Sequence, residues 1–150
     1  MASPEVLFIC TGNYYRSRFS EAWFNHLAVR DGSPWRAFSR GLHIDWAPPG
    51  LSPHTHAYLQ ARGVPLTHTT PDRHALTVAD LERATHAVAL KEAEHRVYMQ
   101  TQFPAWADRI TYWHFHDLDV DTAEVMLPTL ERHVTEFYQQ LTSAGAAPTR

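Results

Sequence analysis

The sequence predicts an α/β fold: a single-domain, doubly wound parallel sheet of about four strands with helices on both faces. Short apolar runs rich in β-branched and aromatic residues alternate with segments of helical periodicity, which is typical of a parallel sheet. No internal repeat, low-complexity segment or linker divides the 150 residues, so residues 1–150 are expected to form one domain. A content of 44% hydrophobic and 19% charged residues is that of a globular chain with a sizeable core.

The first third of the chain predicts a strand, a helix and a second strand. The run "EVLFI", residues 5–9, is typical of a short buried strand. From Ser17 onward, apolar residues recur on one face of a helix that ends before Asp31. The run "WRAFS", residues 35–39, predicts the second strand, and the prolines of residues 46–50 predict a loop.

The middle of the chain predicts two helices with a short strand between them. Ser52, followed by proline, is typical of an N-cap, and Gly63 is suited to the left-handed turn that ends this helix. Residues 64–68, "VPLTH", are predicted to form a short strand despite their proline. Thr77 and Asp80 suit the cap and the first turn of the next helix.

The last third continues the alternation. Residues 86–90 and 109–115 predict strands, and residues 91–99 predict the helix between them. The last helix carries apolar residues at steps of three and four between residues 127 and 141. Pro128 must either lie in its first turn or kink it. Because such sheets bind ligands at the carboxyl ends of their strands, the ends of the first and last strands are expected to share one rim.

Charge and cysteine content exclude several classes of function. A net charge of −3 provides no basic field, so no nucleic-acid partner is expected. No apolar run approaches the roughly 20 residues that span a bilayer, and the N-terminus lacks a basic-then-apolar signal, so no membrane association is expected. One cysteine cannot form an internal disulfide, which favours a cytoplasmic location.

That cysteine, Cys10, closes the first predicted strand in the run "VLFICTGNYYRSR". A tight loop between a strand and a helix presents backbone N–H groups, and the positive end of the helix makes it favourable for an anion. Gly12 and Asn13 suit the turn, because glycine relieves steric strain and asparagine tolerates left-handed backbone angles. Arg16 has the planar fork that grips two oxygens of a phosphate-like anion, and Ser17 is placed to hydrogen-bond the sulfur. The pattern predicts a thiolate nucleophile facing a bound tetrahedral anion.

The spacing Cys10-x5-Arg16-Ser17, with Gly12 and Asn13 at matching positions, resembles the low-molecular-weight protein tyrosine phosphatases over nearly the whole chain. The resemblance implies a cysteine-dependent phosphomonoester hydrolase that acts on phosphotyrosine or other aryl phosphates through a phosphocysteine intermediate. It implies no metal and no cofactor. The expected partner is a phosphorylated protein or a small aryl phosphate, with inorganic phosphate as a product inhibitor and a monomer or weak homodimer as the assembly.

The resemblance also assigns residues around the loop. Thr11, Tyr14 and Tyr15 belong to the substrate-binding loop, and Trp46 lies where the family places an aromatic wall for the substrate ring. Asn13 would be held by hydrogen bonds that involve Ser39 and His68. Tyr15 stands where many members carry a second cysteine. Arg18 replaces a common proline and is expected to add positive charge near the pocket mouth.

The family's general acid is an aspartate followed by proline on a late loop. Here the loop "HDLDVD" offers Asp117 and Asp119, neither of them before proline, and Asp121 suits a helix cap. Alignment of the preceding strand end favours Asp117 as the acid, with Asp119 as the alternative.

Three other functions remain open from the sequence. His114 and His116, beside Asp117 and Asp119, could bind a metal, because alternate residues of a strand share a face. An arsenate reductase of the same fold would have to use an external thiol, because the chain has no second cysteine. The absent Asp-Pro pair also leaves open a non-catalytic module that binds phosphate or phosphoproteins.

Overall fold

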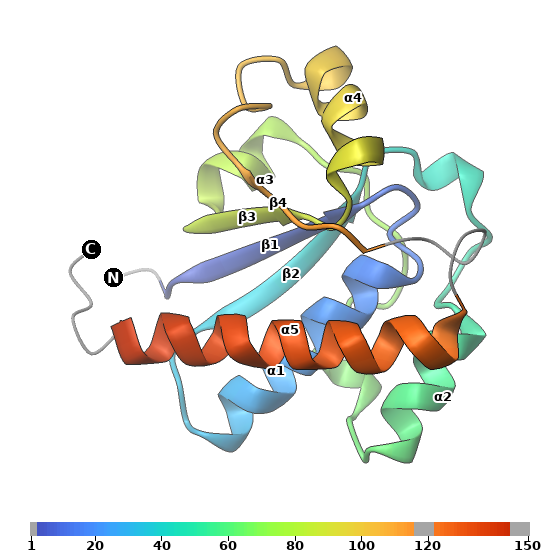
Figure 1. Ribbon diagram of the computed structural model, residues 1–150, viewed down its shortest axis with the longest axis vertical. Helices are drawn as coiled ribbons and strands as arrows, with labels where there is room; N and C mark the ends of the chain where they lie inside the picture. Colours follow the sequence, from blue (N-terminus) through green and yellow to red (C-terminus); the bar gives the residue numbers. More distant parts are fainter. Residues whose placement is uncertain (1–2, 116–121, 145–150) are drawn as a thin grey trace.

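The computed structural model describes residues 3–115 and 122–144, and it confirms the predicted fold class (Figure 1). Four parallel strands form one sheet in the order β2-β1-β3-β4. They are β1 (Glu5–Cys10), β2 (Arg36–Gly41), β3 (His86–Ala89) and β4 (Thr111–Tyr112). Because the strands are parallel, their carboxyl ends lie along one edge of the sheet, where Cys10 pairs in register with Gly41.

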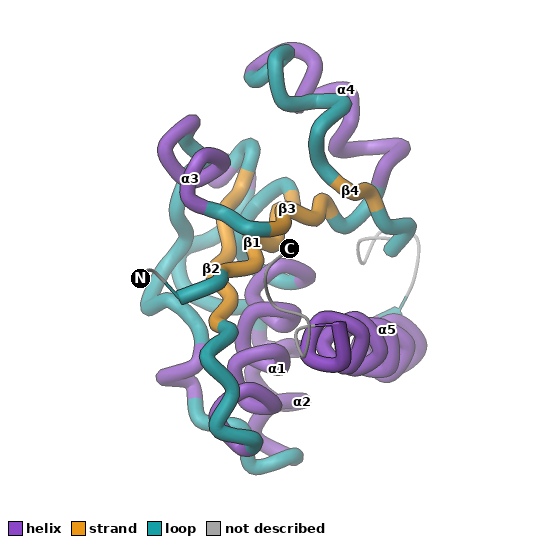
Figure 2. Tube along the Cα trace, turned by 90° about the vertical axis from the view of Figure 1, so that its left-hand side faces the viewer, coloured by secondary structure: helices purple, strands orange, loops and turns teal. Residues whose placement is uncertain are grey.

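Helices cover both faces of this sheet. Figure 1 shows α1 (Arg16–Arg30), α2 (Pro53–Ala61) and α5 (Ala123–Ala144) below it. The helices α3 (Val78–Arg83) and α4 (Glu92–Gln102) lie above it. Figure 2, turned by a quarter, again shows α1, α2 and α5 grouped on one side, with α3 on the other.

Alternate residues of β1 enter different hydrophobic clusters. Val6 and Phe8 point to the face covered by α1 and α5, whereas Leu7 and Ile9 point to the face covered by α3 and α4. All four side chains are fully buried. A parallel strand that is buried on both faces reads as a continuous apolar run, which explains the sequence "VLFI".

Two predicted strands differ from the observed structure. The strand predicted at residues 64–68 is wrong, because Leu66–His68 form a short 3-10 helix, η2. Pro65 has no N–H to donate to a ladder, and its carbonyl instead accepts a hydrogen bond from the N–H of His68 at 3.2 Å. The strand predicted at residues 109–115 is also shorter, since β4 covers Thr111–Tyr112.

The helix ends agree with the sequence in part. Thr77 and Asp80 form the expected capping box at the start of α3, with the Thr77 hydroxyl accepting from the Asp80 N–H at 3.2 Å. Ser52 occupies the N-cap position of α2, but none of the described hydrogen bonds involves its buried hydroxyl. Pro128 lies inside α5, beyond its first turn. Among the helices of the described segments, none combines the length and apolar character that crossing a bilayer requires.

Candidate active site

The loop between β1 and α1 forms the floor of a pocket of about 510 Å³. Residues 10–12 and 14–16 of this loop line one side of the pocket, residues 46–48 form a wall, and Glu94 and Tyr98 of α4 complete it. We call residues 10–17 the cradle and residues 44–50 the wall loop. The cradle ends at the first turn of α1, so the positive end of a 15-residue helix faces the pocket.

Cys10 lies at the carboxyl end of β1, where its side chain is almost completely buried. Its sulfur lies 2.9 Å from the hydroxyl oxygen of Ser17 in the first turn of α1. That oxygen also accepts a hydrogen bond from the side-chain amide of Asn13 at 3.0 Å. The Ser17 hydroxyl can therefore donate to the sulfur while its oxygen accepts from Asn13.

Two cradle residues have the conformations that the turn requires. Asn13 has a φ of 50°, so it adopts the expected left-handed backbone. Gly12 was expected to relieve steric strain within the turn, but its φ is not positive. Its small size matters instead because its backbone lies against the wall loop. A Cβ at Gly12 would meet the Cβ of Ala47 at 2.7 Å, so any larger residue would push the wall away.

Arg16 reaches the pocket but is also tied to two other elements. Its guanidinium donates to the carbonyl of Phe115, just after β4, at 3.0 Å and to Oε2 of Glu94 at 3.2 Å. The side chain is almost fully buried, so its direction is fixed by these neighbours. A bound anion would therefore share this guanidinium with Glu94.

Glu94 places a carboxylate in the pocket that the sequence analysis missed. Its Oε2 accepts hydrogen bonds from Arg16 and from the hydroxyl of Thr11. Burial favours a higher pKa, but the hydrogen bond from His95, the charge of Arg16 and the hydrogen bond from Thr11 outweigh it. Together they hold the pKa of Glu94 well below its ordinary value, so this carboxylate is ionised at neutral pH.

His95 lies fully buried behind Glu94. Its Nδ1 accepts the backbone N–H of Lys91 at 3.0 Å, which places the ring hydrogen on Nε2. Nε2 lies 3.1 Å from the Thr11 hydroxyl and 3.3 Å from Oε2 of Glu94. The position of Glu94 and His95 in the sequence could have identified them as site residues. The run "KEAEH" follows β3 and therefore begins at the ligand-binding edge of the sheet.

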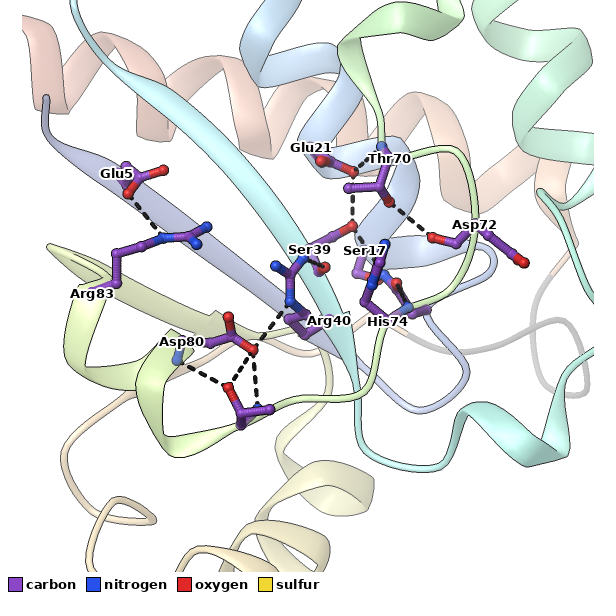
Figure 3. Close-up of polar contacts among 12 residues, drawn as sticks. Glu5, Ser17, Glu21, Ser39, Arg40, Thr70, Asp72, His74, Asp80 and Arg83 are labelled. Atoms are coloured by element: carbon purple, nitrogen blue, oxygen red, sulfur yellow. Dashed lines mark hydrogen bonds and ion pairs between the residues drawn. The ribbon is translucent and has the colours of Figure 1, made fainter.

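Ser39 lies next to the cradle, but His68 does not occupy the place expected for it. The Asn13 amide donates to the Ser39 hydroxyl at 2.9 Å, and this hydroxyl donates to Oε1 of Glu21 at 2.8 Å (Figure 3). The Asn13 carbonyl oxygen Oδ1 accepts the backbone N–H of His74 at 2.7 Å. His68 lies at the end of η2, and its carbonyl accepts from Asn25. His74 therefore makes the contact expected of His68.

Aromatic side chains form the rim of the pocket. Trp46 is 61% exposed, and its indole stacks on the His43 ring with centroids 3.9 Å apart. The Tyr98 ring stands at a steep angle to Trp46, at 5.8 Å between centroids. Tyr14 is half-buried and Tyr15 buried, and both line the pocket. The structure therefore brings Trp46 to the pocket, as the resemblance implies.

Several predicted residues lie outside the described part of the chain. These are the candidate acids Asp117 and Asp119, the predicted cap Asp121, and His116. His114 is described and largely exposed, with Nε2 4.0 Å from Oε1 of Glu92. Within residues 3–115 and 122–144, no group of three or more metal-ligating side chains is gathered. The choice of acid and the metal hypothesis both stay predictions.

Comparisons with known proteins show the family and the fold. Residues 5–144 match the model of a family described as low molecular weight phosphotyrosine protein phosphatase. A protein-arginine-phosphatase from Bacillus subtilis is 29% identical over 107 residues, 71% of this chain and 67% of that protein. An arsenate reductase from Staphylococcus epidermidis is 32% identical over 72 residues, 48% of this chain and 49% of that protein. The crystal structure of a low molecular weight protein tyrosine phosphatase from T. tengcongensis superposes with a TM-score of 0.74, at 26% identity, covering 94% of this chain and 99% of the other.

Proposed function

The chain belongs to the low molecular weight phosphotyrosine protein phosphatase family, and we propose that it is a cysteine-dependent phosphatase of phosphotyrosine or other aryl phosphate monoesters. The observation that carries the proposal is the position of the Cys10 sulfur. It lies 2.9 Å from the Ser17 hydroxyl on the floor of the pocket, at the positive end of α1.

In the proposed reaction the Cys10 thiolate attacks phosphorus in line with the leaving group. The S–P bond forms as the P–O bond to the aryl group breaks, and a carboxylic acid gives its proton to the departing oxygen. We assign this acid to Asp117, with Asp119 as the alternative. Water then cleaves the S–P bond, the same carboxylate takes the proton from the water, and phosphate leaves as the Ser17 hydroxyl again stabilises the thiolate.

The cradle would stabilise the transition state by charge and hydrogen bonds. The backbone N–H groups of residues 11–16 and the guanidinium of Arg16 would hold the equatorial oxygens of the phosphoryl group as charge develops. Hydrogen bonds to Phe115 and Glu94 orient the Arg16 guanidinium, and Arg16 lines the pocket.

The test of this proposal is the Cys10→Ser variant. We expect it to lose at least about 1,000-fold in turnover of p-nitrophenyl phosphate, because a neutral hydroxyl is a far poorer nucleophile than a thiolate. Binding of inorganic phosphate, measured by calorimetry, should persist and would show that the fold and the cradle are intact. A Cys10→Ser variant that kept most of its turnover would refute the mechanism.

A second candidate substrate is a phosphorylated arginine side chain. Glu94 supplies a carboxylate, and Trp46 and Tyr98 supply ring faces, all of which attract a cationic guanidinium group. The relative in Bacillus subtilis is named for that activity. Comparing kcat/KM for one peptide carrying either phosphotyrosine or phosphoarginine decides between the two. Arsenate-dependent oxidation of a small thiol in the same assay series would instead support the reductase alternative.

A further inference from the structure

Arg18 lies beneath the cradle and not at the pocket mouth where the sequence analysis expected it. Its side chain is 1% exposed. The guanidinium donates to the carbonyl of Asn13 at 3.4 Å and to that of Gly50, at the end of the wall loop, at 3.2 Å. It also donates to the Thr69 hydroxyl at 2.6 Å and to the Thr70 carbonyl at 2.5 Å. One side chain thus joins the cradle, the wall loop and the segment after η2.

These contacts close a ring of hydrogen bonds behind the cradle. The Asn13 amide donates to Ser39, and Ser39 donates to Oε1 of Glu21. The Thr69 hydroxyl donates to the same oxygen at 2.7 Å and accepts a hydrogen bond from Arg18. Arg18 in turn donates to the backbone carbonyl of Asn13, which closes the ring. Figure 3 shows Glu21 and Ser39 together at this place, with Thr70 beside them. The buried ring, as we call it, consists of Asn13, Ser39, Glu21, Thr69 and Arg18, all less than a tenth exposed.

The buried ring holds one acid and one base away from water. Burial raises the pKa of Glu21, and hydrogen bonds from Thr69, Ser39 and Thr70 oppose the rise. Burial also lowers the pKa of Arg18, and electrostatic attraction by Glu21, Asp72 and Cys10 opposes that change. The charge of Arg18 also lowers the pKa of Glu21, so each group favours the charged form of the other.

We propose that Arg18 is a positioning residue of the anion site, whose buried cation balances Glu21 and fixes the backbone of Asn13 and the wall loop in the geometry that binds phosphate. Asn13 has a left-handed backbone, and an arginine bound to its carbonyl holds the peptide that follows it in one orientation. Tyr14, Tyr15 and Arg16, which follow Asn13 in the cradle, line the pocket. The inference rests on the proposed function, in that the cradle must bind phosphate.

The test measures phosphate binding without turnover. Iodoacetamide alkylates Cys10, and the concentration of inorganic phosphate that halves this rate reports the affinity of the cradle. We compare the wild type with Arg18→Met, which removes the cation, and with Arg18→Lys, which keeps it. The matched control is Arg62→Met, since Arg62 pairs with Glu131 and covers the Tyr58 ring, away from the buried ring.

For Arg18→Met we expect the half-protecting phosphate concentration to rise about 10-fold, as buried partners of the guanidinium lose their donor. Arg18→Lys should recover at least half of this loss on a logarithmic scale, and Arg62→Met should match the wild type. If Arg18→Met does not fold, Thr69→Val breaks the same ring without changing a charge and should raise the concentration about 3-fold.

Two results would overturn the inference. One is a folded Arg18→Met or Thr69→Val chain that phosphate protects as well as it protects the wild type. The other is an Arg18→Lys chain as weak as Arg18→Met, because the positive charge would then have no role. A wild-type chain that phosphate does not protect would instead refute the proposed function, and this inference with it.

Discussion

At the scale of single residues, the pocket holds two opposite charges within hydrogen-bond distance. Arg16 is suited to bind a phosphate dianion, yet it donates to the carboxylate of Glu94 at 3.2 Å. A negative charge beside an anion site repels the ligand, so an entering phosphate must weaken this ion pair. We therefore expect Glu94 to lower the affinity of the cradle for simple anions.

The Glu94→Gln variant tests this conclusion. We expect its affinity for inorganic phosphate to rise about 5-fold, because two unit charges about 4 Å apart interact by roughly 1 kcal/mol in water. Inhibition of aryl phosphate hydrolysis by phosphate gives the measurement. The matched control is Glu92→Gln on the same helix turn, where the carboxylate pairs with Arg96. A fall in phosphate affinity would contradict the account, because Glu94 would then serve mainly to orient Arg16.

The same carboxylate predicts a pH dependence of stability. The pKa of Glu94 is lower in the folded chain than its ordinary value of 4.5, so its contribution is complete above that pH and is lost as the pH falls below it. The difference in free energy of unfolding between the wild type and Glu94→Gln should be constant from about pH 7 to 5 and shrink under more acidic conditions. Urea denaturation at several pH values measures it. If this difference in free energy of unfolding instead grew as the pH fell below 4.5, the result would contradict the lowered pKa of Glu94.

At the scale of elements, the cradle and the wall loop are in contact through a glycine. Gly12→Ala would set two Cβ atoms 2.7 Å apart, so Ala47 would have to move and the pocket would widen. We expect a loss of stability of about 1–3 kcal/mol and a higher KM for aryl phosphates. Adding Ala47→Gly removes the opposing Cβ and should restore most of both properties. If the double variant is no better than Gly12→Ala, contact with the wall is not the reason for glycine.

Most elements could be predicted from the sequence, but their contacts could not. Apolar runs, hydrophobic periodicity and capping residues located the four strands and five α-helices of the described residues, because burial and helix capping leave local patterns in the chain. The prediction of a strand at residues 64–68 was wrong because it relied on their apolar content. Pro65 has no backbone N–H and cannot donate a hydrogen bond to a neighbouring strand. The hydrogen bond to Asn13 that was expected from His68 is made by the backbone N–H of His74. Sequence could not show this, because the path of an irregular loop depends on long-range hydrogen bonds.

At the scale of the whole molecule, the candidate site is built where the four parallel strands end. β1 leads into Cys10, the wall loop follows β2, Glu94 follows β3, and the Phe115 carbonyl that holds Arg16 follows β4. The sequence motif identified Cys10 and Arg16 because they lie close together in the chain. Glu94 and the buried position of Arg18 were missed because each acquires its role from segments distant in sequence.

The central claim is that Cys10 carries the phosphoryl group during turnover. The most direct measurement is mass spectrometry of the enzyme after rapid acid quench during hydrolysis of an aryl phosphate. The account predicts a peptide containing Cys10 that is heavier by one phosphoryl group, a modification that is absent when substrate is omitted. Rapid turnover with no phosphoryl group on that peptide at any quench time, or with the group on another residue, would contradict it.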